Sequence, residues 1–238
     1  MGRLWPPELA SFAALMSQPL RAIIFDLDGT LIDSAVELTA AVNGGLAHYK
    51  LPPVTVSQVK TMIGDGAMAL TERAFAAVGR RLNAAGLAEA LEVVRGEYAR
   101  QPPSGFYPGA RETVERLAGM GLSLAVCTNK PEKPAKRILG QLGVSQHFRA
   151  IVGGDSFATK KPDPGPIQAL MEHLGGTSED TIMIGDSAND VIAGRIAGLY
   201  TVAVSYGYSN TPPHELGADA LVDSLEEIFP ILAHRLPR

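Results

Sequence analysis

Polar side chains with catalytic potential follow three short apolar runs of this 238-residue chain. They are Asp26 and Asp28 after residues 22–25, Thr128 and Asn129 after residues 122–127, and Asp186, Ser187 and Asp190 after residues 181–184. Lys161 stands in a Lys-Pro-Asp-Pro segment before a predicted helix. If the runs are neighbouring parallel strands, these residues meet in one crevice, because open parallel sheets bind ligands beyond their carboxyl ends. Carboxylates that hold a divalent cation, with a lysine and polar donors that hold phosphate, suit phosphoryl transfer.

The elements that must position these residues alternate along most of the chain. Strands are predicted at residues 22–25, 122–127, 150–152, 181–184, 200–204 and 220–222, where the apolar runs are short and continuous. Helices are predicted at about 109–120, 131–142, 164–174, 188–197 and 224–234. Strands that alternate with helices indicate a doubly wound α/β fold, in which helices cover both faces of a parallel sheet.

Residues 34–100 break this alternation, because they contain helical patterns and no convincing strand. Capping-box patterns predict the starts of two helices, at Ser34 with Glu37 and at Thr55 with Gln58. Two more helices are predicted at residues 67–78 and 84–100. A small all-helical unit is therefore expected to be inserted after the first strand.

The expected division of the chain is a core interrupted by this helical cap. The core comprises residues 21–32 and 106–238, and the cap comprises residues 33–105. Residues 32–34 and 101–108 are the expected hinges. Residues 1–20 are expected to form an N-terminal extension with one short helix and no catalytic part. A secretory signal is not expected there, because one arginine precedes the apolar stretch and no small-residue cleavage site follows it.

Composition and charge restrict the classes of function. The chain is 46% apolar and 19% charged, which suits a globular core, and its apolar runs fall short of the roughly 20 residues of a membrane span. A net charge of −4 argues against a nucleic-acid binder, which usually carries a basic face. The single cysteine, Cys127, fits a reducing, cytoplasmic location. We therefore expect a small phosphomonoester as partner, with no nucleic acid or membrane, and a monomer or homodimer.

Four motifs in this order resemble those of the haloacid dehalogenase superfamily. They are Asp-Leu-Asp-Gly-Thr-Leu at residues 26–31, Thr128-Asn129, Lys161-Pro162 and Gly185-Asp186-Ser187-x-x-Asp190. Singly, each motif could be a turn or a helix cap, but together at successive strand ends they favour a site. The resemblance covers nearly all of residues 21–235. Residues 63–66 with Arg73 also resemble the cap loop of bacterial phosphoglycolate phosphatases.

The resemblance implies a role for each motif residue. Asp26 would be the nucleophile that forms an aspartyl-phosphate, and Asp28 would be the general acid and then the general base. Mg²⁺ would be held by Asp26, Asp186 and the backbone carbonyl of Asp28. Thr128 and the backbone amide of Asn129 would bind phosphate oxygens, and Lys161 would offset negative charge. Asp190 would hydrogen-bond Lys161 or a metal-bound water, and Ser187, like Asp190, would support the residues that contact metal and phosphate. Lys161 is preferred to Lys160 because the family lysine immediately precedes a proline.

The resemblance of residues 63–66 and Arg73 to the cap loop of those phosphatases implies 2-phosphoglycolate as the substrate. The carboxylate of this small molecule lies close to its phosphate, so the closed cap must supply a donor near the crevice. The candidates are the backbone amides around Gly64 and Gly66 and the guanidinium of Arg73. Asp65 would repel such a substrate unless it points away or pairs with a cation.

Other activities of the same fold need residues that differ from those of this chain, or share its motifs. A dehalogenase does not need Asp28, and a phosphonate hydrolase needs a cap lysine, for which Lys50 and Lys60 are not obviously placed. A sugar-phosphate phosphatase or a β-phosphoglucomutase-like phosphotransferase is the nearest enzymatic alternative, because the same four motifs serve it. A non-catalytic protein that binds a phosphate ligand is the alternative of a different class, and the second carboxylate argues against it.

Overall fold

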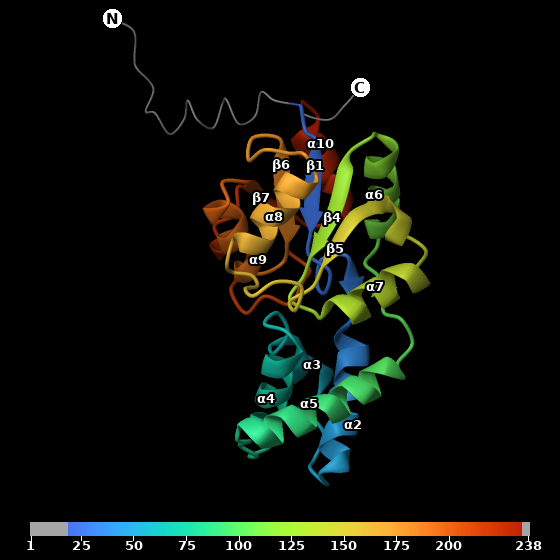
Figure 1. The fold of residues 1–238 in the computed structure, drawn as a ribbon, viewed down its shortest axis with the longest axis vertical. Coiled ribbons are helices and arrows are strands. Elements are labelled where there is room, and N and C mark those ends of the chain that lie inside the picture. Colours follow the sequence, from blue (N-terminus) through green and yellow to red (C-terminus); the bar gives the residue numbers. More distant parts are fainter. Residues whose placement is uncertain (1–18, 235–238) are drawn as a thin grey trace, which may run out of the picture.

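The computed structural model describes residues 19–234. Its main sheet has six parallel strands in the order β5-β4-β1-β6-β7-β8. They are β1 (Ala22–Phe25), β4 (Ser123–Cys127), β5 (Phe148–Val152), β6 (Thr181–Gly185), β7 (Tyr200–Val204) and β8 (Ala220–Val222). In Figure 1 the arrow of β1 points toward a separate group of helices at the bottom of the view. The predicted α/β fold with a parallel sheet is confirmed.

Helices cover both faces of this sheet. They are α6 (Ala110–Gly119), α7 (Glu132–Gln141), α8 (Gly165–His173), α9 (Ala188–Ile196) and α10 (Ile228–Leu232). Alternate residues of β1 point to opposite faces, so Ile23 and Phe25 pack with α6 and α7, whereas Ile24 packs with α8 and α9. Because β1 is buried on both faces, packing in the sheet fixes the place where β1 ends and therefore where the next residue, Asp26, begins.

The cap is a layer of helices with an apolar core of its own. Its helices are α2 (Ala35–His48), α3 (Val56–Lys60), α4 (Ala67–Ala77) and α5 (Ala84–Ala99). Val42 of α2, Phe75 of α4 and Val94 of α5 are buried in one apolar cluster. The cap therefore packs independently of the sheet, beyond the carboxyl end of β1 (Figure 1).

The two chain crossings between core and cap pair with each other. The strands β2 (Ile32–Asp33) and β3 (Gly105–Phe106) form a two-stranded antiparallel sheet. The sequence predicts only hinges and a linker here, because two residues are too few to show a strand pattern. The pairing joins the entry and the exit of the cap into one double connection.

One of the two predicted capping boxes is wrong. At the start of α3, Thr55 and Gln58 form the predicted reciprocal hydrogen bonds. At the start of α2, the hydroxyl of Ser34 donates instead to Asp28 Oδ1 at 2.6 Å. Ser34 is fully buried beside this carboxylate, and a charged acceptor binds a hydroxyl more strongly than a neutral one does.

Two further expectations concern the ends of the chain. The helix predicted at residues 224–234 is shorter, because Leu225–Glu227 form a 3₁₀ turn and α10 begins only at Ile228. Pro230 favours the first turn of a helix, which explains the later start. The short helix predicted within residues 1–20 falls mainly on residues 1–18, outside the described residues. Between residues 19 and 234, no helix is long and apolar enough to cross a membrane.

Candidate active site

The strand order brings three of the predicted motifs to one edge of the sheet. β1 lies between β4 and β6 and is parallel to both. Asp26 follows β1, Thr128 follows β4 and Asp186 follows β6. The strand order reverses at β1 and β6, which is where open α/β sheets bind their ligands. The motifs therefore meet in the crevice that the sequence predicts.

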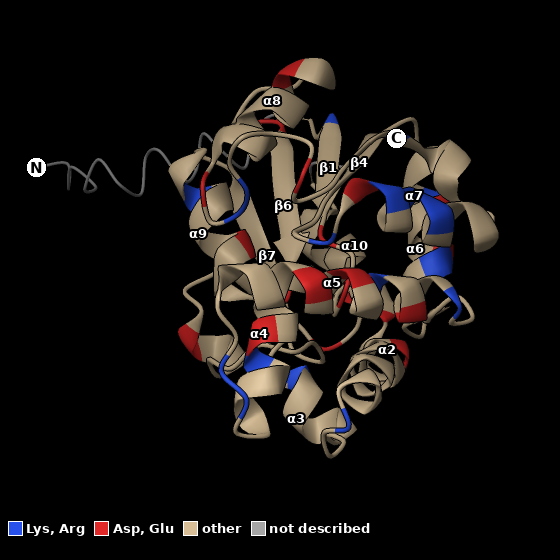
Figure 2. Ribbon diagram, turned by 60° about the horizontal axis from the view of Figure 1, so that its bottom comes forward, with Lys and Arg blue, Asp and Glu red and all other residues tan. Residues whose placement is uncertain are grey.

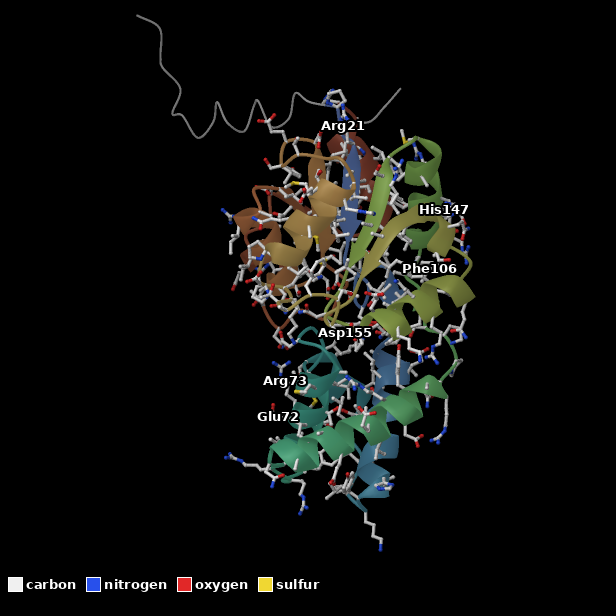
Figure 3. The ribbon with its side chains drawn as sticks, viewed as in Figure 1. Arg21, Glu72, Arg73, Phe106, His147 and Asp155 are labelled. Carbon is white, nitrogen blue, oxygen red and sulfur yellow. The ribbon has the colours of Figure 1, made fainter. Side chains whose placement is uncertain are left out.

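A cavity of about 650 Å³ lies at this crevice, between core and cap. Its lining includes Asp26, Asp28 and Lys130 from the core and Gly64, Gly66 and Tyr98 from the cap. Helices α5 and α7 contribute to opposite sides, and Figure 2 shows acidic residues along α5 and basic residues on α7. In Figure 3, Asp155, which also lines the cavity, lies where the core meets the cap.

Lys161 is the lysine beside the predicted nucleophile. It is 2% exposed, and its Nζ lies 3.0 Å from Asp26 Oδ1 and 2.5 Å from Asp190 Oδ1. Burial opposes the charge of Lys161, but the carboxylates of Asp190 and Asp26 raise its pKa above the usual range. Lys160 lies elsewhere, since its Nζ donates to the backbone carbonyl of Asp65 in the cap. Lys161 is therefore placed to offset negative charge on Asp26.

Three carboxylates gather at the same place. Oxygens of Asp26, Asp186 and Asp190 all lie within 4.8 Å of one another. Burial raises the pKa of Asp26 to about 7, although Lys161 opposes this shift. Burial, with the charges of Asp190 and Asp26, also raises the pKa of Asp186. Carboxylates this close repel one another when ionised, so the group is suited to hold a divalent cation.

Asp26 and Asp186 are the members of this group that could bind a metal. Both oxygens of Asp190 are engaged, because Oδ1 accepts from Lys161 and Oδ2 accepts from the backbone N–H and the hydroxyl of Ser187. Asp186 fits into a recess made by two glycines. A Cβ at Gly29 would lie 2.3 Å from Asp186 Oδ2, and one at Gly207 would lie 2.2 Å from Asp186 Cβ.

The second motif carboxylate, Asp28, has a basic partner that the sequence analysis did not identify. Nζ of Lys130 lies 3.0 Å from each of the two oxygens of Asp28. Burial opposes the charge of Lys130, but Asp28 raises the pKa of the lysine, so it stays positively charged. The available signal was its position directly after Thr128 and Asn129, which places it at the same strand end.

Asn129 connects the core to the cap. Its Nδ2 donates to the backbone carbonyls of Gly64 and Lys161, both at 2.9 Å. Thr128 is 3% exposed, and its hydroxyl accepts the backbone N–H of Lys130. Since the side-chain amide of Asn129 already has these two partners, the backbone amide is the group left for the predicted phosphate contact.

The cap loop that contains Gly64 docks on the start of α9. Asn189 Nδ2 donates to Asp65 Oδ1 at 2.8 Å and to the carbonyl of Gly64 at 3.3 Å. Asp65 also forms an ion pair with Arg73. Partial burial opposes ionisation of Asp65, but the hydrogen bonds from Asn189 and Arg73 lower its pKa. Asp65 therefore pairs with a cation, which is one of the two arrangements expected of it.

Arg73 is not placed where the sequence analysis expected it. Its guanidinium donates to Asp65 and to the backbone carbonyl of Met62, and Arg73 is not part of the cavity lining. Figure 3 shows Arg73 on α4, at the side of the cap. The guanidinium is bound by a nearby carboxylate, and the direct contact between Arg73 and the substrate stays a prediction.

The geometry agrees with a family comparison. Residues 23–204 match the family model of the haloacid dehalogenase-like hydrolases, a span that includes the whole cap and all four motifs. The chain belongs to this family. The match confirms the resemblance that the motifs indicate.

Similar proteins of this hydrolase family are named as phosphatases. The chain is 44% identical to a phosphoglycolate phosphatase of Rhodospirillum rubrum, over 87% of this chain and 89% of that one. It is 39% identical to a phosphoglycolate phosphatase of Agrobacterium fabrum, over 93% and 97%. A crystal structure of a predicted phosphoglycolate phosphatase from Haemophilus somnus 129pt superposes with a TM-score of 0.84 at 33% identity, over 89% and 97%. The predicted enzyme class, a phosphatase of this family, is confirmed.

Two tyrosines of this haloacid dehalogenase-like hydrolase were missed by the sequence analysis. Tyr98 of the cap places its ring 4.5 Å from Nζ of Lys130. Tyr208 donates its backbone N–H to Asp186 Oδ2 at 2.6 Å, and its hydroxyl donates to Asp33 in β2. No sequence pattern identifies either residue, because both act through contacts between elements distant in the chain.

Proposed function

We propose that this protein is a Mg²⁺-dependent phosphomonoester hydrolase with 2-phosphoglycolate as its preferred substrate. The observation that carries the proposal is the buried group in which Asp26 and Asp186 lie at adjacent strand ends and Lys161 lies beside Asp26. Relatives named phosphoglycolate phosphatases align over most of the chain, which supports the choice of substrate.

In the first half of the reaction, Asp26 attacks the phosphorus atom of the substrate. A bond forms between a carboxylate oxygen and phosphorus, and the bond between phosphorus and the leaving oxygen breaks. Asp28 gives its proton to the leaving oxygen, so that glycolate departs as an alcohol. Lys161, 3.0 Å from Asp26, offsets the negative charge that nucleophile and phosphate bring together.

In the second half, water releases the phosphate. Asp28, now a carboxylate, takes a proton from the attacking water while the water oxygen bonds to phosphorus. The bond between Asp26 and phosphorus breaks, which restores the Asp26 carboxylate and frees inorganic phosphate. Thr128 and the backbone amide of Asn129 hold the phosphate oxygens in both halves.

The donor set fits a magnesium ion. Asp26, Asp186 and the backbone carbonyl of Asp28 would hold it, which is the small number of protein ligands that Mg²⁺ usually has. When bound, the ion supplies positive charge against the phosphate oxygens. The mutual repulsion of the buried carboxylates supports this assignment.

A feature of the cap supports the proposal of a small anionic leaving group. Gly66 precedes α4 without a side-chain cap, and both Gly66 and Ala67 line the cavity. The start of this helix therefore faces the cavity with backbone donors and the positive end of its dipole. A carboxylate near this end of α4 would be stabilised, as the sequence analysis expects for the backbone around Gly64 and Gly66.

The test is phosphate release from a panel of small phosphomonoesters in the presence of Mg²⁺. The panel contains 2-phosphoglycolate, hexose phosphates and an aryl phosphate, and we expect the highest kcat/KM with 2-phosphoglycolate. A higher value with a sugar phosphate would replace the substrate but keep the phosphatase. Conversion of β-glucose 1-phosphate to glucose 6-phosphate would indicate a phosphotransferase, and binding without any release would indicate a non-catalytic protein.

A further inference from the structure

We propose that Lys130 binds the carboxylate of the substrate and makes the site selective for phosphorylated hydroxy acids. The inference rests on the proposed function, because it assigns the residue that recognises the leaving group. In this proposal Lys130 binds the substrate carboxylate, a role for which the sequence suggests Arg73. The four motifs imply no role for Lys130.

Of the buried basic side chains that the structure describes, Lys130 is the one that could bind a substrate carboxylate. Among the residues from 19 to 234, Lys130 and Lys161 are the buried basic side chains, at 6% and 2% exposure. Lys161 lies between Asp26 and Asp190 and is committed to both. Lys130 has one carboxylate partner and lines the cavity.

The position of Lys130 matches the chemistry of the substrate. Its Nζ lies 3.0 Å from both oxygens of Asp28, the residue that would protonate the leaving oxygen. In 2-phosphoglycolate one methylene group separates the leaving oxygen from the carboxylate, so the two groups lie within about 4 Å of each other. A substrate placed for proton transfer from Asp28 therefore brings its carboxylate close to Lys130.

Lys130 can bind the substrate carboxylate while it stays paired with Asp28. An ammonium group has three N–H donors, and the oxygens of Asp28 occupy one side of it. The ring of Tyr98 lies 4.5 Å from Nζ and restricts the side chain to the boundary between core and cap. Without the lysine, no positive charge would lie between the substrate carboxylate and Asp28, which becomes a carboxylate once it has given up its proton.

The other basic side chains of the cavity are less suitable. Arg95 forms an ion pair with Glu92 on the same helix. Arg137 donates to the backbone carbonyl of Ala99 at the end of α5. Lys133 is exposed, so water weakens its attraction for an anion. Lys133 is for that reason a matched control for Lys130.

The test compares two substrates that differ in one charge. They are 2-phosphoglycolate and 2-hydroxyethyl phosphate, in which a hydroxymethyl group replaces the carboxylate. The measured quantity is the ratio of their kcat/KM values in the wild type, in Lys130→Met and in Lys133→Met. We expect Lys130→Met to lower the ratio by about tenfold to a hundredfold, as expected for one lost charge-assisted hydrogen bond. Lys133→Met should change it by less than about twofold.

A second variant separates recognition from the positioning of Asp28. Lys130→Gln can still donate a hydrogen bond to Asp28 but carries no charge, and it should also lose the preference for the carboxylate. Equal losses on both substrates in Lys130→Met and Lys130→Gln would overturn the inference, because they would show that Lys130 only positions Asp28. If the wild type itself shows no preference for 2-phosphoglycolate, the proposed function fails and the inference fails with it.

Binding measurements decide the case in which the variants do not turn over. Calorimetry compares Asp26→Asn with Asp26→Asn/Lys130→Gln, using 2-phosphoglycolate and inorganic phosphate as ligands. We expect the second substitution to weaken 2-phosphoglycolate by at least about tenfold and inorganic phosphate much less. Equal weakening of both ligands contradicts the inference. Far-UV circular dichroism and thermal unfolding establish that each variant is folded.

Discussion

At the residue scale, the proposed chemistry depends on how each buried carboxylate is compensated. Asp26 lies 3.0 Å from Lys161, and Asp28 lies 3.0 Å from Lys130. Asp186 instead accepts the backbone N–H of Tyr208. One lysine therefore lies beside the proposed nucleophile and the other beside the proposed general acid. A buried ion pair is costly to break by removing one partner, so these four residues depend on one another.

Replacement of Asp26 by asparagine should abolish turnover and leave the fold intact. The amide is a poor nucleophile for phosphorus, and its volume matches that of the carboxylic acid. The measurement is steady-state phosphate release, with mass spectrometry to exclude deamidation. The control is Asp155→Asn, the same change at an exposed residue of the cavity, which should retain most of the activity. Substantial turnover by intact Asp26→Asn would exclude the aspartyl-phosphate.

The raised pKa of Asp26 predicts a pH dependence of stability in the metal-free protein. The folded state holds this proton up to about pH 7, whereas the unfolded chain releases it near 3.8. Asp26 therefore contributes stability below its unfolded pKa and loses it as the pH rises through its folded pKa. We expect the thermal midpoint of Asp26→Asn, relative to that of the wild type, to be higher at about pH 8 than at about pH 5. Thermal unfolding with chelator measures the difference, and an equal gap at both pH values would contradict the shift.

At the element scale, the contact between α9 and the loop before α4 couples the cap to the core. Asn189 binds Asp65 and Gly64 of the loop, and Asn129, which follows β4, binds Gly64 as well. Arg73 holds Asp65 from within the cap. The loop is therefore held by donors of both the core and the cap, and Arg73 acts on the site through Asp65.

Arg73→Ala should then lower kcat/KM by about threefold to tenfold, with similar losses for 2-phosphoglycolate and an aryl phosphate. The reason is that Asp65 loses its cation and presents an uncompensated charge near an anionic substrate. Addition of Asp65→Asn should restore much of the loss, whereas Arg80→Ala, at an exposed arginine after α4, should have little effect. A loss confined to 2-phosphoglycolate, without rescue, would return Arg73 to the role expected from the sequence. Steady-state kinetics of the wild type and these three variants give the answer.

At the scale of the whole molecule, the sheet positions the residues of the candidate site, and the cap covers the cavity beside them. The strand ends that carry Asp26 and Asp186 belong to neighbouring strands β1 and β6, which are buried throughout. Their positions therefore depend on apolar packing. The paired strands β2 and β3 connect the cap to this rigid base at a single place.

Removal of metal should stop hydrolysis while the fold persists. The packed sheet already holds the carboxylate positions, and the ion adds charge compensation without being needed for folding. Phosphate release with excess chelator should fall to background and return when Mg²⁺ is added in excess. Far-UV circular dichroism should stay unchanged in the same samples. Full activity after exhaustive chelation would overturn the metal assignment.

The local sequence determined most of the elements and which polar residues lie at the strand ends. Apolar runs such as residues 181–184 are continuous because a strand covered on both faces has no solvent side, so their pattern is readable without a structure. The polar residues directly after these runs, including Asp26 and Asp186, necessarily lie at strand ends. The order of the motifs along the chain was sufficient to predict the crevice and the family.

Only the tertiary structure decided which charges meet. Ser34 has the pattern of a helix cap, yet it binds Asp28, and Arg73 has the reach of a substrate ligand, yet it binds Asp65. The sequence places Lys130 directly after Thr128 and Asn129 but does not show its partners, which are Asp28 of the core and Tyr98 of the cap. A side chain chooses among the partners that folding brings within about 3 Å, and these come from segments far apart in the chain. Local patterns carry no information about that choice, because it depends on distances that exist only after the cap and the core have packed together.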